Sequence, residues 1–367
     1  MSESNSLRPV IIPLGGFLGA GKTSLILAAA RILQQRGVRA AAILNDQGTE
    51  LADTRWVQAQ GVQTDEVMGG CFCCLFSAMV DAAERLRAHS AEVIFAEAVG
   101  SCTDISATTL QPLKLYHKDR FRLAPYTVLV DPAREQQLAG SDANADFTFL
   151  FEKQVEEADL ICFTKSDLFP DLYRPAMAAP VRTLSSLTGD GVEAWLDEVL
   201  VGAFPSGTKT LDIDYEHYAR AEAALAWLNC SILVTLRTAL SPSSLIGPLL
   251  DKLDAALTES QLQIAHLKIV DDTSTGFLKA SIIRNGEEPA LQGDLAASSA
   301  IVHELLLNIR AVGEPVLLQE LVEKHLADLP GKLEIRSMQC FKPSPPTPEY
   351  RIREAAAVAA DTSWTGQ

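Results

Sequence analysis

The chain has 367 residues, which is long for one hydrophobic core and predicts two domains. Its net charge of -16 argues against nucleic acid as a general partner, although the acidity also serves solubility alone. Segment 1–9 is polar, and no apolar run approaches the ~20 residues that a membrane-spanning helix needs. Three of the seven cysteines fall within four positions, which does not suit a disulfide framework and predicts a reducing, cytoplasmic location.

The first two hundred residues alternate short apolar runs with helical stretches. Strands are expected at 10–14, 40–44, 92–96, 126–130 and 160–163. Helices are expected at 23–35, 75–88 and 147–157. Alternation of this kind predicts an α/β fold with a mostly parallel sheet and helices on both faces.

The pattern changes after residue 203. Segment 204–214 is expected as a linker, followed by strands at 231–236, 265–270, 277–284, 300–310 and 332–338 and helices at 243–257 and 315–326. This order predicts a smaller C-terminal α+β domain with a mainly antiparallel sheet. Segment 342–348 is Pro-rich and extended, and 354–367 is expected to be frayed. The predicted divisions are 8–203 for the α/β domain, 204–229 for a linker and connecting helix, 230–345 for the α+β domain and 346–367 for an extended, flexible tail.

Residues 16–23, GFLGAGKT, match the pattern G-x-x-x-x-G-K-[ST] between an expected strand and an expected helix. The glycines let backbone N–H groups face a β-phosphate, and the helix adds its positive N-terminal end. Lys22 is expected to reach the β- and γ-phosphates, and the Thr23 hydroxyl to ligate Mg²⁺. A Gly-rich turn without a ligand is the alternative. The expected nucleotide-contacting residues here are Gly16, Gly19, Ala20, Gly21, Lys22, Thr23 and Ser24.

A second nucleotide motif, Thr-Lys-Ser-Asp, ends the expected strand at 160–163 and resembles the guanine-reading N-K-x-D motif of GTPases. The Asp167 carboxylate can accept both guanine N–H donors, and the Lys165 stem can lie along the base. Adenine offers no such donor pair, so the motif favours GTP. Thr164 replaces the usual Asn, and a plain strand-end turn is the alternative. Segment 185–191, SSLTGDG, is expected as a second base-contacting loop.

Two acidic residues are candidates for the Mg²⁺ site. Glu97 ends the strand VIFAE and is followed by Gly100, whose missing side chain leaves room beside the γ-phosphate. Asp46 ends the second strand in LNDQG. Either carboxylate can hold Mg²⁺, or can instead be a helix cap or a loop residue. Together with Lys22 and Thr23, Glu97 forms the expected catalytic set.

A cysteine cluster, Gly-Gly-Cys71-Phe-Cys73-Cys74, lies between these motifs. Soft thiolates favour Zn²⁺, Cu(I) and similar ions. On an extended segment Cys71 and Cys73 point the same way, and a turn can bring in Cys74. Three thiolates leave one position for another protein group, water or a client ligand. Buried cysteines acting as small hydrophobes, or a redox role, are the alternatives.

These residues together resemble one family. The motifs GGFLGAGKT, LNDQG, MGGCFCC, EAVG, VDP and QVEEADLICFTKSD occur in the order found in CobW-like GTPases, relatives of HypB and UreG. The resemblance covers about residues 8–202. It implies a GTPase that binds a transition metal, Zn²⁺ or Co²⁺, and delivers it, or helps insert a metal or cobalamin cofactor, into a client. The implied partner is a metalloprotein or cobalamin-dependent enzyme, and a homodimer is a compatible assembly.

The sequence also departs from the family. Many relatives carry His-rich segments, whereas the six histidines here are scattered, which argues against bulk metal storage. They are His89, His117, His217, His266, His303 and His325. EAVG replaces the E-T-S-G of many relatives, and the last third matches only loosely.

Three functions stay open from the sequence. The leading one is a metallochaperone in which GTP orders the cysteine segment and hydrolysis releases metal. The second is a GTP-gated activator of a corrinoid or other metalloenzyme, with structural or regulatory cysteines. The third is a non-enzymatic adaptor that holds a nucleotide passively.

Overall fold

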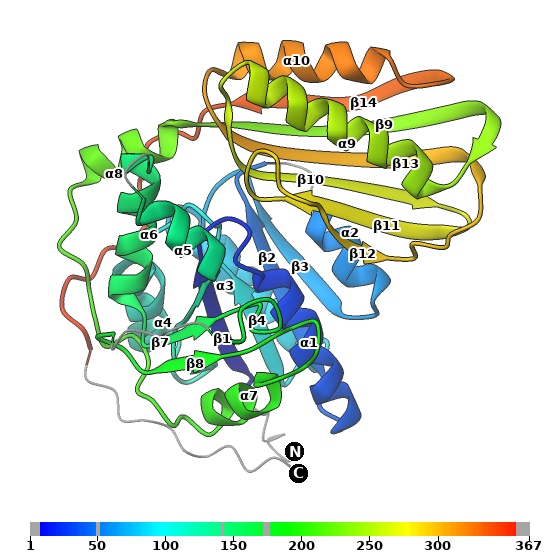
Figure 1. The fold of residues 1–367 in the computed structure, drawn as a ribbon. Helices are drawn as coiled ribbons and strands as arrows, with labels where there is room; N and C mark the ends of the chain where they lie inside the picture. Colours follow the sequence, from blue (N-terminus) through cyan, green and yellow to red (C-terminus); the bar gives the residue numbers. More distant parts are fainter. Residues whose placement is uncertain (1–7, 49–51, 141–142, 172–176, 357–367) are drawn as a thin grey trace. The chain divides into compact units, whose positions relative to one another are not determined.

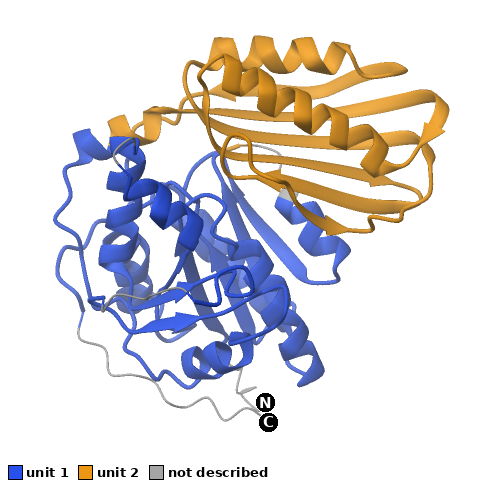
Figure 2. Cartoon of the chain, in the orientation of Figure 1, with its two compact units in different colours: residues 1–47, 53–218, 346–367 blue, residues 48–52, 219–345 orange. Residues whose placement is uncertain are grey.

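The computed structural model describes residues 8–48, 52–140, 143–171 and 177–356, so most of the expected frayed end lies outside the described residues. Two units are distinguished by colour in Figure 2. Unit 1 comprises 1–47, 53–218 and 346–367, and unit 2 comprises 48–52 and 219–345. Among the described residues, no helix combines the length and the apolar character that crossing a membrane requires.

Unit 1 is built on a parallel sheet. In spatial order it consists of β3 (Gln63–Met68), β2 (Ala40–Asp46), β4 (Val93–Glu97), β1 (Val10–Gly16), β6 (Thr127–Val130), β7 (Leu160–Phe163) and β8 (Val181–Thr183), and β5 (Arg122–Leu123) pairs with β1. Every strand pair is parallel. The central strand β1 is buried along its whole length, as its uninterrupted apolar sequence predicts.

The helices of unit 1 cover both faces of this sheet (Figure 1). They are α1 (Lys22–Gln35), α2 (Ala52–Ala59), α3 (Phe76–Ala88), α4 (Gln111–Tyr116), α5 (Pro132–Leu138), α6 (Ala145–Glu157) and α7 (Val192–Leu200), with a π-helical turn, η1 (Ser106–Leu110), before α4 and α8 (Tyr215–Ala223) leading into unit 2. The chain moves from β1 toward β2 through α1, and in the opposite direction from β6 to β7 through α6. Right-handed crossovers in opposite directions place these helices on opposite faces.

Unit 2 is an antiparallel sheet with two helices on one face (Figure 1). Its strands, in spatial order, are β12 (Ala290–Gly293), β11 (Gly276–Ile282), β10 (Gln263–Thr273), β13 (Ala300–Val312), β9 (Leu225–Leu240) and β14 (Lys332–Phe341). The helices are α9 (Pro242–Glu259) and α10 (Pro315–Ala327). Alternate residues of the strands and the apolar faces of both helices form one continuous core. The fold class predicted from the sequence is confirmed.

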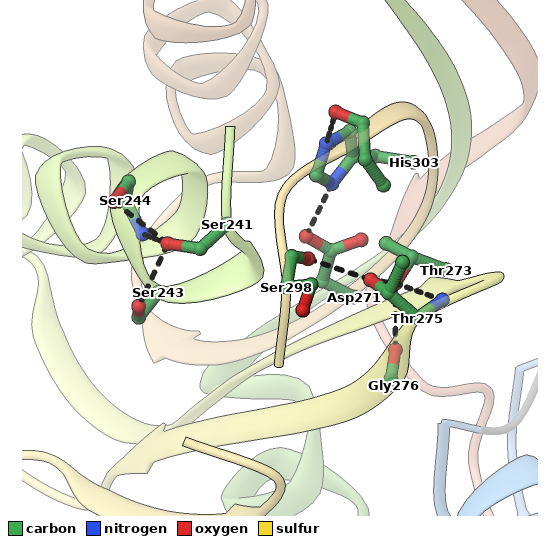
Figure 3. A network of polar contacts seen from close by, with 10 residues as sticks. Ser241, Ser243, Ser244, Asp271, Thr273, Thr275, Gly276, Ser298 and His303 are labelled. Atoms are coloured by element: carbon green, nitrogen blue, oxygen red, sulfur yellow. Dashed lines mark hydrogen bonds and ion pairs between the residues drawn. The ribbon is translucent and has the colours of Figure 1, made fainter. Parts of the chain in front are cut away.

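A buried, hydrogen-bonded Asp–His pair lies in this second sheet, where Figure 3 shows the Asp271 carboxylate facing the His303 ring. His303 Nδ1 is 2.7 Å from Asp271 Oδ2, and both side chains are completely buried. The other ring nitrogen, Nε2, lies 3.1 Å from the carbonyl oxygen of Ala300. Burial raises the pKa of Asp271 to about 6. Because no solvent reaches the pair, it is a structural element of unit 2.

Several elements differ from the expectations. Helix α2 and strand β3 were not predicted, because β3 (QTDEVM) has no apolar run and mostly half-buried or exposed side chains. Strand β9 is 16 residues long, although only 231–236 was expected as a strand. Its first eight residues are all buried, a pattern that alternation on one face does not produce.

Candidate nucleotide and metal site

The phosphate-binding segment lies between β1 and α1, as predicted. Gly21 precedes the helix with φ +94°, and a Cβ there would meet no atom within 4 Å, so the loop presents open space at this point. Gly16 has φ +129°, and a Cβ there would lie 2.5 Å from the carbonyl oxygen of Leu129. Lys22 is almost fully buried and donates a 2.8 Å hydrogen bond from Nζ to the carbonyl oxygen of Gly16. The backbone at Gly16 and Gly21 therefore adopts conformations that glycine favours, as the phosphate-binding pattern predicts.

Of the three residues predicted to hold Mg²⁺, Thr23 and Glu97 are in direct contact. The Thr23 hydroxyl donates to both carboxylate oxygens of Glu97, at 3.1 and 3.0 Å. The two come together because β4 pairs with β1 and both strands end at this edge. Asp46 ends β2, the next strand along the sheet. A hydroxyl beside a carboxylate is the oxygen chemistry that Mg²⁺ accepts, so the residues present fit this ion.

The guanine-reading segment begins directly after β7. The hydroxyl of Thr164 donates to the carbonyl oxygen of Ala20 at 2.9 Å, which joins this motif to the phosphate-binding loop. Thr164, which stands where the motif usually has Asn, thus links the two loops. Asp167 is exposed, and no hydrogen bond or ion pair of its carboxylate occurs within the described part of the chain. That carboxylate is therefore available to a ligand.

One partner in this region was missed by the sequence analysis. Lys165 Nζ lies 2.7 Å from Asp131 Oδ2, and the Asp131 side chain is buried. Asp131 also caps α5 by accepting from the backbone N–H of Ala133 at 2.9 Å. It follows β6 in the segment VDP. The sequence feature that could have identified Asp131 is an acidic residue directly after a buried strand.

The three clustered cysteines lie together in the turn before α3. The backbone N–H groups of Cys74 and Leu75 both donate to the carbonyl oxygen of Cys71, at 3.0 and 2.9 Å. The extended segment expected for Cys71 and Cys73 is therefore wrong, because this hydrogen-bonded turn replaces it. Cys74 Sγ lies 3.6 Å from Cys71 Sγ and 3.5 Å from Cys73 Sγ. Sulfurs of a tetrahedral zinc site, with Zn–S of ~2.3 Å, lie about 3.8 Å apart, so the spacing suits one ion.

A fourth buried cysteine, Cys102, influences the pKa of both Cys71 and Cys73. In the described part of the chain, only the sulfurs of Cys71, Cys73 and Cys74 form a group that lies within 4.8 Å of one another. Hydrogen bonds from Cys102, Cys73 and Cys74 lower the pKa of Cys71 well below its usual value. The same contacts, with Cys102 the largest contributor, raise the pKa of Cys73, and the contact with Cys71 raises the pKa of Cys74 to about 11. Among the thiols of the cluster, Cys71 is therefore the one whose thiolate form, the form that ligates metal, is favoured.

Asn45 holds the cysteine turn in place. Its Nδ2 donates to the carbonyl oxygens of Val67, at 2.8 Å, and Gly70, at 2.7 Å. Its Oδ1 accepts from the backbone N–H of Phe72 at 2.9 Å. The side chain is nearly buried, and the neighbouring residue is Asp46. One amide therefore fixes the backbone on both sides of Cys71.

Helix α6 anchors the loop that follows Glu97 through hydrogen bonds. Gln154 Nε2 donates to the carbonyl oxygens of Gly100, at 3.0 Å, and Cys102, at 2.9 Å. One turn further on, the buried Glu157 carboxylate accepts from the backbone N–H of Ser106 at 3.0 Å. Burial raises the pKa of Glu157 to about 8. Both ends of this loop are therefore anchored within unit 1.

The segment 346–356, here called the C-terminal strap, lies against the cysteine turn. Thr347 donates its backbone N–H to Cys74 Sγ at 3.2 Å, and Glu349 donates its backbone N–H to the Cys73 carbonyl oxygen at 3.0 Å. Arg351 Nε lies 2.8 Å from Oδ2 of Asp104, whose side chain is fully buried. The strap therefore closes one side of the thiol cluster.

Comparison with known proteins agrees with this arrangement. The family model described as "CobW/HypB/UreG, nucleotide-binding domain" matches residues 10–187. Those residues contain the phosphate-binding loop, the cysteine turn, the Glu97 loop and the guanine-reading segment. Residues 10–187 form a nucleotide-binding domain of the CobW/HypB/UreG family. The family resemblance drawn from the sequence is confirmed.

Individual relatives of this CobW-like chain are distant. The zinc chaperone YjiA of Escherichia coli (strain K12) is 27% identical over 196 residues, which are 49% of this chain and 58% of YjiA, less than two thirds of that protein. HypB from Helicobacter pylori in complex with nickel has 17% identity and a TM-score of 0.40, over 53% of this chain and 86% of that one. Zn(II)-bound YjiA from E. coli has 17% identity and a TM-score of 0.32, over 88% and 99%. The family assignment rests on the family model, not on these two structures.

Proposed function

We propose that this CobW-like protein binds and hydrolyses GTP and uses the nucleotide state to control a transition metal held by Cys71, Cys73 and Cys74. The observation that carries the proposal is the convergence of both sites on one edge of the sheet. Asn45, one residue before the end of β2, holds the cysteine turn. Glu97, which ends the adjacent strand β4, holds Thr23 of the phosphate loop.

On the nucleotide side, we assign the phosphate contacts to the glycine-rich loop, Lys22 and Thr23. The Lys22 ammonium, now on the Gly16 carbonyl, would exchange that partner for β- and γ-phosphate oxygens. Thr23, with Glu97 and Asp46, would hold Mg²⁺, which when bound neutralises charge on the transferred phosphoryl group. Gly100 lies in the loop after Glu97 and would approach the γ-phosphate.

Guanine specificity is assigned to Thr164, Lys165 and Asp167. Asp131 supports this assignment, because its buried carboxylate holds the Lys165 side chain, whose stem would lie along the base. The exposed Asp167 carboxylate would accept the two N–H donors of guanine. A base without that donor pair would leave the carboxylate unpaired and bind more weakly.

On the metal side, we propose Zn²⁺ or Co²⁺ as the cargo and a metalloprotein as the client that receives it. The close sulfur spacing and the lowered pKa of Cys71 support thiolate ligation. The zinc chaperone named among the relatives supports a metal-handling role. A more specific version of this proposal is that the protein helps to insert a cobalamin cofactor into its client.

The test is a Co²⁺ titration of the nucleotide-free, GDP-bound and GTP-analogue-bound protein, read by the cobalt–thiolate charge-transfer band. We expect different Co²⁺ affinities in the two nucleotide states and, by linkage, an equal effect of Co²⁺ on nucleotide affinity. In Lys22→Ala, the lost charged hydrogen bond should weaken nucleotide binding by about 1.5–3 kcal/mol. Its nucleotide-free Co²⁺ band should remain.

The outcomes separate the competing functions. Absence of the band in every state would leave the cysteines structural and end the metallochaperone proposal. An identical band and affinity in all states would keep metal binding but reject control by GTP. Lack of GTP turnover, alone and with a client, would favour a passive nucleotide-binding adaptor.

A further inference from the structure

The C-terminal strap is anchored to unit 1 at the end that lies away from the cysteines. The Arg351 guanidinium pairs with the buried Asp104 carboxylate at 2.8 Å. The next residue, Ile352, donates its backbone N–H to the carbonyl oxygen of Ala107 at 2.9 Å. The segment 346–350, which precedes this anchor, is the part of the strap that lies at the cysteine turn.

This segment lies over the most accessible sulfur of the metal site. Cys71 and Cys73 are 3% and 1% exposed, whereas Cys74 is half-buried. Thr347 donates its backbone N–H to the Cys74 sulfur at 3.2 Å. The strap therefore covers the side of the cluster from which a chelator or a client's ligand would reach a bound ion.

Glu349 fastens this part of the strap to the helix that follows the cysteines. Within the described residues, Leu75 gives α3 no side-chain cap, and the first turn holds no acidic residue. The Glu349 carboxylate supplies the acceptor instead. It accepts from the backbone N–H of Ser77, at 3.3 and 3.1 Å, and from the Ser77 hydroxyl at 2.6 Å. A carboxylate in this place pairs N–H groups that the helix itself leaves unsatisfied and complements the helix dipole.

The Tyr350 ring is a second, separate attachment. Its centroid lies 5.4 Å from that of Phe76, edge to face, and 5.6 Å from that of Tyr116. Tyr350 is nevertheless 40% exposed, and Thr347 and Glu349 are exposed as well. A segment that is held by surface contacts and buries little apolar area opens locally, without unfolding of the domain. The segment 346–350 can therefore lift while the anchored part of the strap stays in place.

We propose that the strap is a latch on the metal site. While 346–350 is closed, a bound ion exchanges slowly, and when this segment lifts, Cys74 becomes open to the ligand that takes the ion. The inference rests on the proposed metal-binding function and adds its regulation. A client that displaces the strap reaches Cys74, so the latch restricts transfer to a partner that binds at the start of α3.

The experiment compares wild type, Glu349→Ala and Tyr350→Ala as full-length proteins, with Co²⁺ as the probe. Growth of the cobalt–thiolate band after rapid mixing gives the association rate, and its decay in excess EDTA gives the rate of loss. Both rates should rise about 3–10-fold in each variant, as the loss of one or two exposed contacts predicts. The dissociation constant should change by less than about twofold, because an ion with equal affinity for the open and closed forms does not shift their balance.

Asp254→Ala is the matched control. The Asp254 carboxylate also accepts from one backbone N–H through both oxygens, that of Gly286 at 3.1 and 2.9 Å, but it lies in unit 2. Its loss should leave both Co²⁺ rates at the wild-type values.

The two strap variants remove separate contacts, so each tests the latch by itself. Wild-type rates in both variants would overturn the latch and leave the metal site in place. Faster loss of Co²⁺ with unchanged association would also overturn it, because the substitution would then weaken the metal site itself and not open a cover. Absence of any Co²⁺–thiolate band in the wild type instead overturns the proposed function.

Discussion

Asn45→Leu tests whether one buried amide positions the cysteine turn. Leucine has a similar volume and no charge, so the change removes three hydrogen bonds without adding an ion. The partners left behind are the carbonyl oxygens of Val67 and Gly70 and the backbone N–H of Phe72. At a net ~1 kcal/mol for each bond, the free energy of unfolding should fall by about 3 kcal/mol. Because Gly70 and Phe72 flank Cys71, Co²⁺ affinity should fall about 10–100-fold, as for other outer-shell partners.

The assays are urea unfolding and Co²⁺ titration of the same preparations. Asn285→Leu is the matched control, since Asn285 also makes three hydrogen bonds, with Thr258 Oγ1, the Leu262 carbonyl oxygen and the Ile264 N–H. It lies in unit 2, so it should cost stability and leave Co²⁺ affinity unchanged. Loss of stability without loss of affinity in Asn45→Leu would refute the positioning argument. If neither stability nor Co²⁺ affinity changes in Asn45→Leu, the estimate of ~1 kcal/mol for each lost hydrogen bond is refuted as well.

Three further predictions concern other parts of the molecule. Asp167→Asn should reduce the preference for GTP over ATP at least tenfold, measured by competition binding. It should change the free energy of unfolding by less than about 0.5 kcal/mol, because the side chain is exposed. Arg351→Ala leaves the buried Asp104 carboxylate without the guanidinium that pairs with it, and should cost about 3–5 kcal/mol in urea unfolding. It should also speed the reaction of the Cys74 thiol with a disulfide reagent, because the strap contacts Cys74. Burial raises the pKa of Asp271 to about 6, so the native carboxyl keeps a proton that the unfolded chain has released. Its contribution to stability should therefore fall as pH rises from about 4 to about 6, and Asp271→Asn should remove that slope from the unfolding free energy.

Each of these has a contrary result. Equal GTP and ATP affinity in the wild type would reject guanine reading by Asp167. An unchanged Cys74 reaction rate in Arg351→Ala would show that the strap does not depend on its pair with Asp104. A pH slope that persists in Asp271→Asn would place the responsible proton on another group.

Much of the fold follows from local sequence. The strands β1, β4, β6 and β7 are short apolar runs buried on both faces, and such runs are visible without tertiary information. The phosphate loop is also local, because its glycines, Lys22 and Thr23 are consecutive and its form is set by one strand–turn–helix junction. The edge strand β3, which is not buried on both faces, lacked that pattern and was missed.

The tertiary structure decided how the site is assembled. Asn45 meets the cysteine turn, Asp131 meets Lys165, and Glu97 meets Thr23 only because β2, β4, β6 and β7 end at one edge in a particular order. The strap contacts Cys74 from 273 positions further along the chain. Residue periodicity encodes which face of an element is buried, but not which distant element lies opposite. Strand order and register supply that information. The sequence alone therefore determined the cysteine cluster and the nucleotide motifs, and the folded chain determined the turn that carries the cysteines and the side chains that hold these segments together.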